Sequence, residues 1–89
     1  MSRYARKVDR NHAEIRDGLR ACGFRVADTS RLGSGFPDLV VSAYAVLWMV
    51  EIKMPGEPLT EDEQVFADLW AEHYLVAHSL EEALSLLGN

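Results

Sequence analysis

The sequence predicts an α/β fold in which a mixed sheet is flanked by helices. Apolar residues recur at helical spacing near both ends of the chain. Between them, two runs rich in Val, Leu and Ile indicate neighbouring strands. The pairs Thr60 with Glu63 and Ser79 with Glu82 are capping boxes, which mark the starts of two later helices. A length of 89 residues fits one domain, residues 1–89.

The first helix is expected over about 10–22. Ile15, Leu19 and Cys22 fall on one apolar face of this helix. Gly23 follows at the position where a left-handed residue commonly ends a helix. The chain should therefore turn at this glycine and continue into the sheet.

A short strand, 24–27, and a glycine-containing loop, 29–36, are expected next. The loop contains Gly33, Ser34 and Gly35. Because glycine has no side chain, the backbone of this loop can come close to a ligand.

Two strands, 38–42 and 46–53, are expected to pair as an antiparallel hairpin with a two-residue turn at 44–45. In this register Asp38 faces Glu51. The turn residues are Tyr and Ala, and neither is the Gly or Asn that the positive φ of such turns favours. The register therefore stays open at this point.

The last three elements complete an α-β-β-β-α-β-α order. They are a helix of about 61–72, a short strand over 74–77, and a helix from about Leu80 that ends at Gly88. No repeat or linker interrupts this order, which supports the single-domain reading.

Positive charge is concentrated at the start of the chain. Residues 1–31 hold eight of the nine Lys and Arg residues and four of the fourteen Asp and Glu residues, a charge of +4. Residues 32–89 carry −9, so the whole chain is at −5. A basic N-terminal arm, residues 1–9, is one interpretation, because phosphate contacts come from clustered cations. A solvated basic face is the alternative. The candidate DNA-binding residues are Arg3, Arg6, Lys7, Arg10, Ser34 and Gly35.

The chain is expected to be soluble and cytoplasmic. The single cysteine, Cys22, cannot form an internal disulfide, which fits a reducing compartment. No apolar run reaches the length of a membrane span, and the polar start lacks the hydrophobic region of a signal peptide.

Three side chains point to phosphodiester chemistry. Asp38 follows Pro37, and Glu51 and Lys53 alternate with an apolar residue so that both point to one face of their strand. Two carboxylates side by side repel each other unless a cation lies between them, and hard divalent cations prefer oxygen ligands. A neighbouring lysine can stabilise the charge that develops during hydrolysis or orient a water. An exposed pair of opposite charges is the alternative, but in a strand expected to be buried such charges are costly.

Taken together, these motifs resemble a stand-alone VRR-NUC domain, a virus-type replication-repair nuclease of the PD-(D/E)XK superfamily. The resemblance covers nearly the whole chain in the right order. The stretches that carry it are Asn11-His12-Ala13-Glu14-Ile15, Leu32-Gly33-Ser34-Gly35-Phe36-Pro37-Asp38-Leu39-Val40-Val41, Val50-Glu51-Ile52-Lys53, Leu59-Thr60-Glu61-Asp62-Glu63-Gln64 and Ser79-Leu80-Glu81-Glu82-Ala83-Leu84.

The resemblance implies a restriction-endonuclease-like αβββαβ core with a short C-terminal helix. It also implies a hydrolase, an endodeoxyribonuclease that depends on Mg²⁺ or Mn²⁺. Asp38 and Glu51 would be metal ligands, with the backbone carbonyl of Ile52 as a further ligand. Lys53 would stabilise charge and orient the attacking water.

Two helical residues complete the site that the resemblance implies. Gln64 would support it from the helix that follows the sheet, with a surface glutamine as the alternative. Glu14 would reach in from the first helix as a catalytic residue and metal ligand. The alternative for Glu14 is structural, because it stands three residues after Asn11 and could be its capping-box partner.

Small members of the family resemble Holliday-junction resolvases that act as homodimers in DNA repair. The expected substrate is therefore branched or four-way junction DNA, and the expected state is a homodimer. The alternatives are a nicking or restriction-type nuclease on linear DNA and a non-catalytic DNA-binding or assembly module. One departure is the short loop 54–59, which carries no cation where many relatives have a basic segment.

Overall fold

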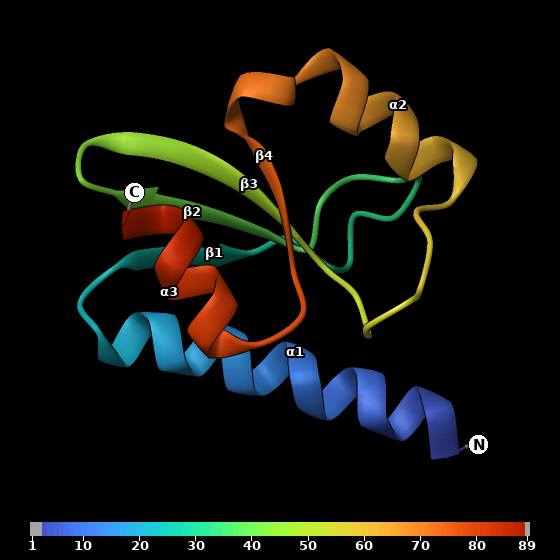
Figure 1. The fold of residues 1–89 in the computed structure, drawn as a ribbon, viewed down its shortest axis with the longest axis horizontal. Helices are drawn as coiled ribbons and strands as arrows, with labels where there is room; N and C mark the ends of the chain where they lie inside the picture. Colours follow the sequence, from blue (N-terminus) through green and yellow to red (C-terminus); the bar gives the residue numbers. More distant parts are fainter. Residues whose placement is uncertain (1–2, 89) are drawn as a thin grey trace.

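The structure is a computed structural model that describes the backbone of residues 3–88 and the side chains of residues 11–88. Helices and strands follow one another in the predicted order (Figure 1). They are α1 (Arg3–Ala21), β1 (Arg25–Asp28), β2 (Leu39–Ala43), β3 (Val46–Ile52), α2 (Glu61–Leu69), a 3₁₀ turn η1 (Ala71–His73), β4 (Tyr74–Ala77) and α3 (Leu80–Gly88).

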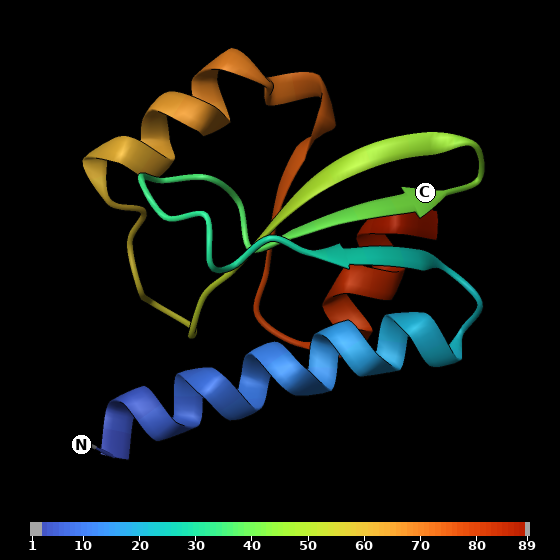
Figure 2. The same ribbon diagram turned by 180° about the vertical axis from the view of Figure 1, so that it is seen from behind.

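One mixed sheet of four strands, in the order β1-β2-β3-β4, forms the centre of the fold. Strand β2 is antiparallel to both β1 and β3, and β4 runs parallel to β3. Helices α1 and α3 lie on one side of the sheet and α2 lies on the other (Figure 1, Figure 2). This arrangement brings the start of β2 and the ends of β3 and β4 to one end of the sheet.

The β2–β3 hairpin has the predicted register. Leu39 pairs with Val50, so the next pair outward brings Asp38 opposite Glu51. Tyr44 and Ala45 both have positive φ, 53° and 67°, which is the conformation of a type I′ turn. That conformation costs roughly 1–2 kcal/mol for a residue other than glycine. The buried faces of both strands must therefore set the register against the preference of the turn.

The expected start of the first helix was wrong. Helix α1 begins at Arg3, so residues 3–9, expected as an arm, are helical. Arg, Lys and Ala favour helix strongly, and no residue in this stretch breaks it. Asn11 therefore lies inside the helix and cannot cap it, which removes the capping role considered for Glu14.

The main core lies between the sheet and the pair α1 and α3. Ile15 and Leu19 of α1 are fully buried there, as predicted, whereas Cys22 is exposed because the helix ends before it. Gly18 allows α1 to approach α3, since a Cβ at this position would collide with the side chain of Leu80. These contacts fix α1 against the sheet and α3.

Helix α2 is shorter than predicted and contains no buried residue. Two contacts join it to the loop before β2. Phe66 makes an edge-to-face contact with Phe36, with ring centroids 5.3 Å apart. A Cβ at Gly35 would lie 2.5 Å from the backbone carbonyl carbon of Asp62, so the loop before β2 packs directly on the start of α2. The loop before β2 therefore helps to determine where α2 lies.

Among the described residues, no helix is both long and apolar enough to cross a membrane.

Candidate active site

Asp38 and Glu51 are adjacent at the end of the sheet. Asp38 directly precedes β2, and its Oδ2 accepts a hydrogen bond from the backbone N–H of Ile52 over 2.9 Å. This bond holds the Asp38 carboxylate beside the last residues of β3. The two acidic side chains predicted to share a site are therefore brought together.

Glu51 is the most unusual group of the pair. Its side chain is buried, with 3% of the residue exposed, and Oε1 has no hydrogen-bond partner among the described residues. Burial, and then the charge of Asp38, raises the pKa of Glu51 well above its ordinary range. A buried carboxylate with an unsatisfied oxygen costs folding free energy unless a proton or a cation compensates it.

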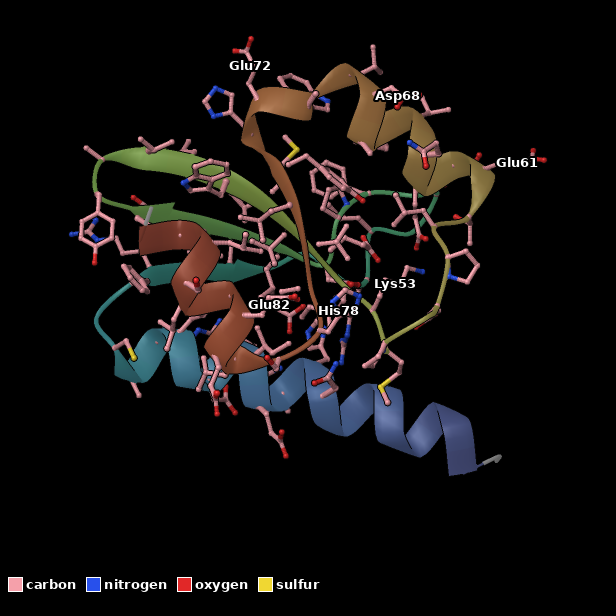
Figure 3. All side chains as sticks on the ribbon, viewed as in Figure 1. Lys53, Glu61, Asp68, Glu72, His78 and Glu82 are labelled. Carbon is pink, nitrogen blue, oxygen red and sulfur yellow. The ribbon has the colours of Figure 1, made fainter. Side chains whose placement is uncertain are left out.

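Lys53 lies at the end of β3, near the loop that leads into α2 (Figure 3). Only 6% of the residue is exposed. Its Nζ lies 2.6 Å from Oε1 of Glu63 and 3.5 Å from Oε2 of Glu57. Burial alone would lower the pKa of Lys53, but the hydrogen bond and charge of Glu63 outweigh it, so the pKa is raised. The lysine is therefore held as a cation in a buried position.

Glu63 contacts Lys53, a contact that the sequence did not predict. It stands at the third position of α2 and forms the predicted capping box with Thr60. Its Oε1 accepts the Thr60 N–H over 2.8 Å and also contacts the Lys53 ammonium. The sequence predicted Glu63 as a helix-capping residue, and no pattern in it indicated a contact with Lys53 as well. The available indication was the position of Glu63 in the first turn of α2, because this turn follows the loop that leaves β3 after Lys53.

Gln64 and Glu14 are not brought into this cluster. Gln64 is exposed, and its Nε2 donates to Oδ1 of Asp68 on α2 over 2.9 Å. Glu14 is exposed on α1, although the adjacent Ile15 is fully buried. A change of one position along a helix turns a side chain by about a quarter turn or more, which places these residues off the face that meets the sheet.

A pocket of about 350 Å³ opens between α1, the loop after β1 and the end of the sheet. Its lining includes Asp38 and Ile52 on the sheet side. The full lining is His12, Ala13, Arg16, Asp28, Ser30, Arg31, Asp38 and Ile52. The residues that α1 contributes near Asp38 are thus His12 and Arg16 in place of Glu14.

Asp28 organises the α1 side of this pocket. Its Oδ2 lies 2.9 Å from Arg16 Nη1 and 3.1 Å from His12 Nε2, and its Oδ1 accepts from Ser30 Oγ over 2.6 Å. Burial would raise the pKa of Asp28, but the hydrogen bonds from Ser30 and Arg16 outweigh it and lower the pKa. His12 has no ligand spacing in the sequence, so only the fold reveals this cluster.

The predicted DNA-binding residues fall into two groups. Ser34 and Gly35 adopt positive φ, 55° and 83°, in the loop that packs on α2. Gly35 is therefore needed for contact with Asp62, and its predicted contact with DNA stays a prediction. The side chains of the other candidates lie outside the described residues. They are Arg3, Arg6, Lys7 and Arg10.

The donor set suits a hard divalent cation, although within residues 11–88 no three Asp, Glu, His or Cys side chains already stand together as metal ligands. Two carboxylates, Asp38 and Glu51, offer oxygen ligands, and the backbone of Ile52 adjoins both. The unpartnered Oε1 of Glu51 is the observation that fits a cation most directly. A further ligand set would come from water or substrate, as is usual for Mg²⁺.

No protein-family profile matches the sequence, and no curated protein matches it. Among solved structures the fold is similar to that of a VRR_NUC domain, with a TM-score of 0.75 and 22% sequence identity. The similarity covers 93% of this chain and 96% of the other. The predicted fold class is confirmed, and this chain has the α/β fold of a VRR-NUC domain.

Proposed function

We propose that this chain is a metal-dependent DNA endonuclease that hydrolyses phosphodiester bonds at the site formed by Asp38, Glu51 and Lys53. The observation that carries the proposal is the buried Glu51 carboxylate, which lies beside that of Asp38 and has one oxygen with no hydrogen-bond partner among the described side chains. A protein keeps such a costly pair when the pair serves a ligand. The fold supports the same conclusion, because it is that of a nuclease-type domain.

Asp38, Glu51 and the backbone carbonyl of Ile52 would hold Mg²⁺ or Mn²⁺. When bound, the cation supplies Lewis-acid polarisation of the phosphate and lowers the pKa of a bound water. The protein's own part is to keep the two carboxylates in register. It does so with the hairpin pairing and the 2.9 Å bond from the Ile52 N–H to Asp38.

Lys53 would orient the attacking water and stabilise negative charge that develops on the phosphate. Its buried ammonium is fixed by Glu63, so little reorganisation is needed as charge develops. Attack at phosphorus would release the 3′ oxygen and leave a 5′-phosphate.

The proposed substrate is branched DNA, such as a four-way junction. The chain is small and has little surface for reading bases, so recognition of DNA shape is the simpler explanation of selectivity. A homodimer would present two active sites to two strands. An apolar surface of β3 that includes the exposed Leu47, with Trp70 beside it, supports self-association.

The test compares four-way junction, flap and linear duplex DNA in Mg²⁺, Mn²⁺ or EDTA. We expect metal-dependent cleavage of the junction, loss of activity in Lys53→Ala, and near wild-type activity in the exposed control Gln64→Ala. Preferential cleavage of linear duplex would favour the nicking or restriction-type alternative. Binding without cleavage in any metal would favour a non-catalytic module, and metal-independent cleavage would contradict the mechanism.

A further inference from the structure

We propose that Arg31, on the loop after β1, binds a DNA backbone phosphate next to the scissile one, in the pocket that it shares with Asp38. The inference rests on the proposed nuclease function and adds a DNA contact to it. Its starting point is the pocket of about 350 Å³, which reaches Asp38 from the side of α1. Neither Glu51 nor Lys53 lines this pocket, and Lys53 is held by Glu63 of α2.

The loop that carries Arg31 is fixed relative to Asp38. The Thr29 N–H donates to the Asp38 carbonyl oxygen over 2.9 Å, which closes the base of the loop on the candidate ligand itself. Ser30 donates to Asp28 Oδ1 from its N–H over 3.1 Å and from its Oγ over 2.6 Å. Arg31 follows these bonded residues directly, so its backbone is held close to the site before any ligand arrives.

Among the side chains that the structure describes, Arg31 is the cation lining this pocket that no carboxylate engages. Asp28 accepts from Arg16, Ser30 and His12, and Arg16 also contacts Asp17 over 2.8 Å. The Arg16 charge is therefore compensated inside the protein. Arg31 is exposed and makes no ion pair with any carboxylate whose side chain the structure describes.

A cation is needed at this position because the neighbouring site is acidic. Asp38, Glu51 and Glu63 gather near the end of β3, and Lys53 is engaged by Glu63. A polyanion that approaches them meets repulsion unless local cations offset it. A guanidinium suits the task because it donates two parallel hydrogen bonds to a phosphate.

The location of the pocket indicates that Arg31 binds a phosphate next to the scissile one, and not the scissile phosphate itself. In the proposed mechanism the scissile phosphate contacts the Asp38–Glu51 pair beside Lys53, which Glu63 of α2 holds. The pocket lies between α1 and the Arg31 loop, where Asp38 and Ile52 line it and Glu51 and Lys53 do not. A strand whose scissile group sits at Asp38 therefore places a neighbouring phosphate within reach of Arg31.

The chain offers a matched control in Arg25. Both arginines are exposed, but Arg31 lies in the loop after β1, whereas Arg25 is the first residue of β1, pairs with Ser42 and lines a different pocket. Arg31→Gln removes a positive charge from the loop after β1, and Arg25→Gln removes one from the start of β1. A difference in DNA binding between the two variants would therefore depend on where the charge lies, because both variants have the same net charge.

The experiment measures binding of four-way junction DNA in EDTA at several salt concentrations. We expect the slope of log K against log salt to fall by about 0.9 in Arg31→Gln and to stay at the wild-type value in Arg25→Gln, because one phosphate contact is lost in the first only. Equal slopes in the two variants would overturn the proposal.

A second measurement locates the phosphate. Single neutral methylphosphonates are placed at each position around the mapped cleavage site. One flanking position should weaken binding by the wild type and leave binding by Arg31→Gln unchanged. If every flanking methylphosphonate weakens both proteins equally, the subsite is wrong, although wild-type cleavage would keep the nuclease proposal. A wild type that neither binds nor cleaves DNA would overturn both.

Discussion

The Nζ atom of Lys53 lies 2.6 Å from the Oε1 atom of Glu63, and this pair joins the end of β3 to the start of α2. Both partners are largely buried, with 7% and 16% of their side chains exposed. One carboxylate oxygen therefore caps a helix and holds the ammonium that we place in the active site. In the proposed mechanism Glu63 would act through Lys53, as a positioning residue.

Glu63→Gln should lower kcat about tenfold and leave KM nearly unchanged. A glutamine can still accept the Thr60 N–H and keep the capping box, but it removes the charge that fixes Lys53. A tenfold loss corresponds to about 1.4 kcal/mol of transition-state stabilisation. Steady-state kinetics on junction DNA measures both constants.

The control for this variant is the adjacent Gln64→Ala, which changes an exposed residue on the same helix. It should retain wild-type kcat. If Gln64→Ala loses activity and Glu63→Gln does not, then the α2 residue that supports the site is Gln64, as the family resemblance implies, and not Glu63.

Glu51→Gln should stabilise the metal-free protein by about 1–3 kcal/mol, because it removes the need to bury an acidic group beside Asp38. The same change should abolish the stabilisation that Mg²⁺ or Mn²⁺ gives to the wild type by binding the folded state. Thermal unfolding with and without metal measures both effects.

Glu14→Gln tests the ligand role that the resemblance implied for Glu14. Because Glu14 is exposed on α1, this variant should respond to metal as the wild type does. A lost metal response in Glu14→Gln would restore Glu14 as a ligand and contradict our assignment.

The sequence predicted the order of the elements and the Asp38–Glu51 pairing because strand alternation and the buried strand faces are local patterns. It failed where the answer depended on packing between distant segments. Glu63 and Gln64 are adjacent, and only the angle at which α2 meets the sheet decides which of them faces Lys53. The contact of His12 with Asp28 likewise joins α1 to β1, a pairing that no spacing in the sequence indicates.

Ala45→Gly should stabilise the protein by about 0.5–1 kcal/mol. Ala45 has a φ of 67°, which glycine adopts without strain, and this gain exceeds the added entropy of the unfolded chain. The matched change Ala27→Gly, at an exposed position in β1, should destabilise, because its backbone does not have positive φ. Urea unfolding of both variants should give opposite signs; two losses would show that the turn is not strained.

Leu47→Glu should convert the proposed homodimer to a monomer. Leu47 is 64% exposed and lines an apolar hollow with Trp48 and Trp70, so a charge there would be buried on association. Val65→Glu is the control, since Val65 is 54% exposed but lies on α2 outside this surface. Sedimentation analysis should show wild type and Val65→Glu as dimers. A wild type that is monomeric while it cleaves junctions would contradict the dimer.

Asp28→Asn should destabilise the protein at neutral pH by about 1–2 kcal/mol, with a smaller effect in acid. The charged Asp28 accepts hydrogen bonds from Ser30 and Arg16, and its partial exposure limits what these bonds contribute. Because the folded state lowers the pKa of Asp28, the contribution is present above the ordinary pKa of aspartate, about 3.9. It is lost as the pH falls through the lower pKa of the folded protein.

Urea unfolding from pH 7 down to pH 2 measures this dependence. The wild-type advantage over Asp28→Asn should shrink progressively once the pH drops below about 4. Ser30→Ala removes one of the donors to the Asp28 carboxylate. The difference in unfolding free energy between wild type and Ser30→Ala should therefore show the same pH trend with a smaller amplitude. Stability curves of wild type and Asp28→Asn that stay parallel over this range would show that the charged form of Asp28 does not hold α1 and the Arg31 loop together.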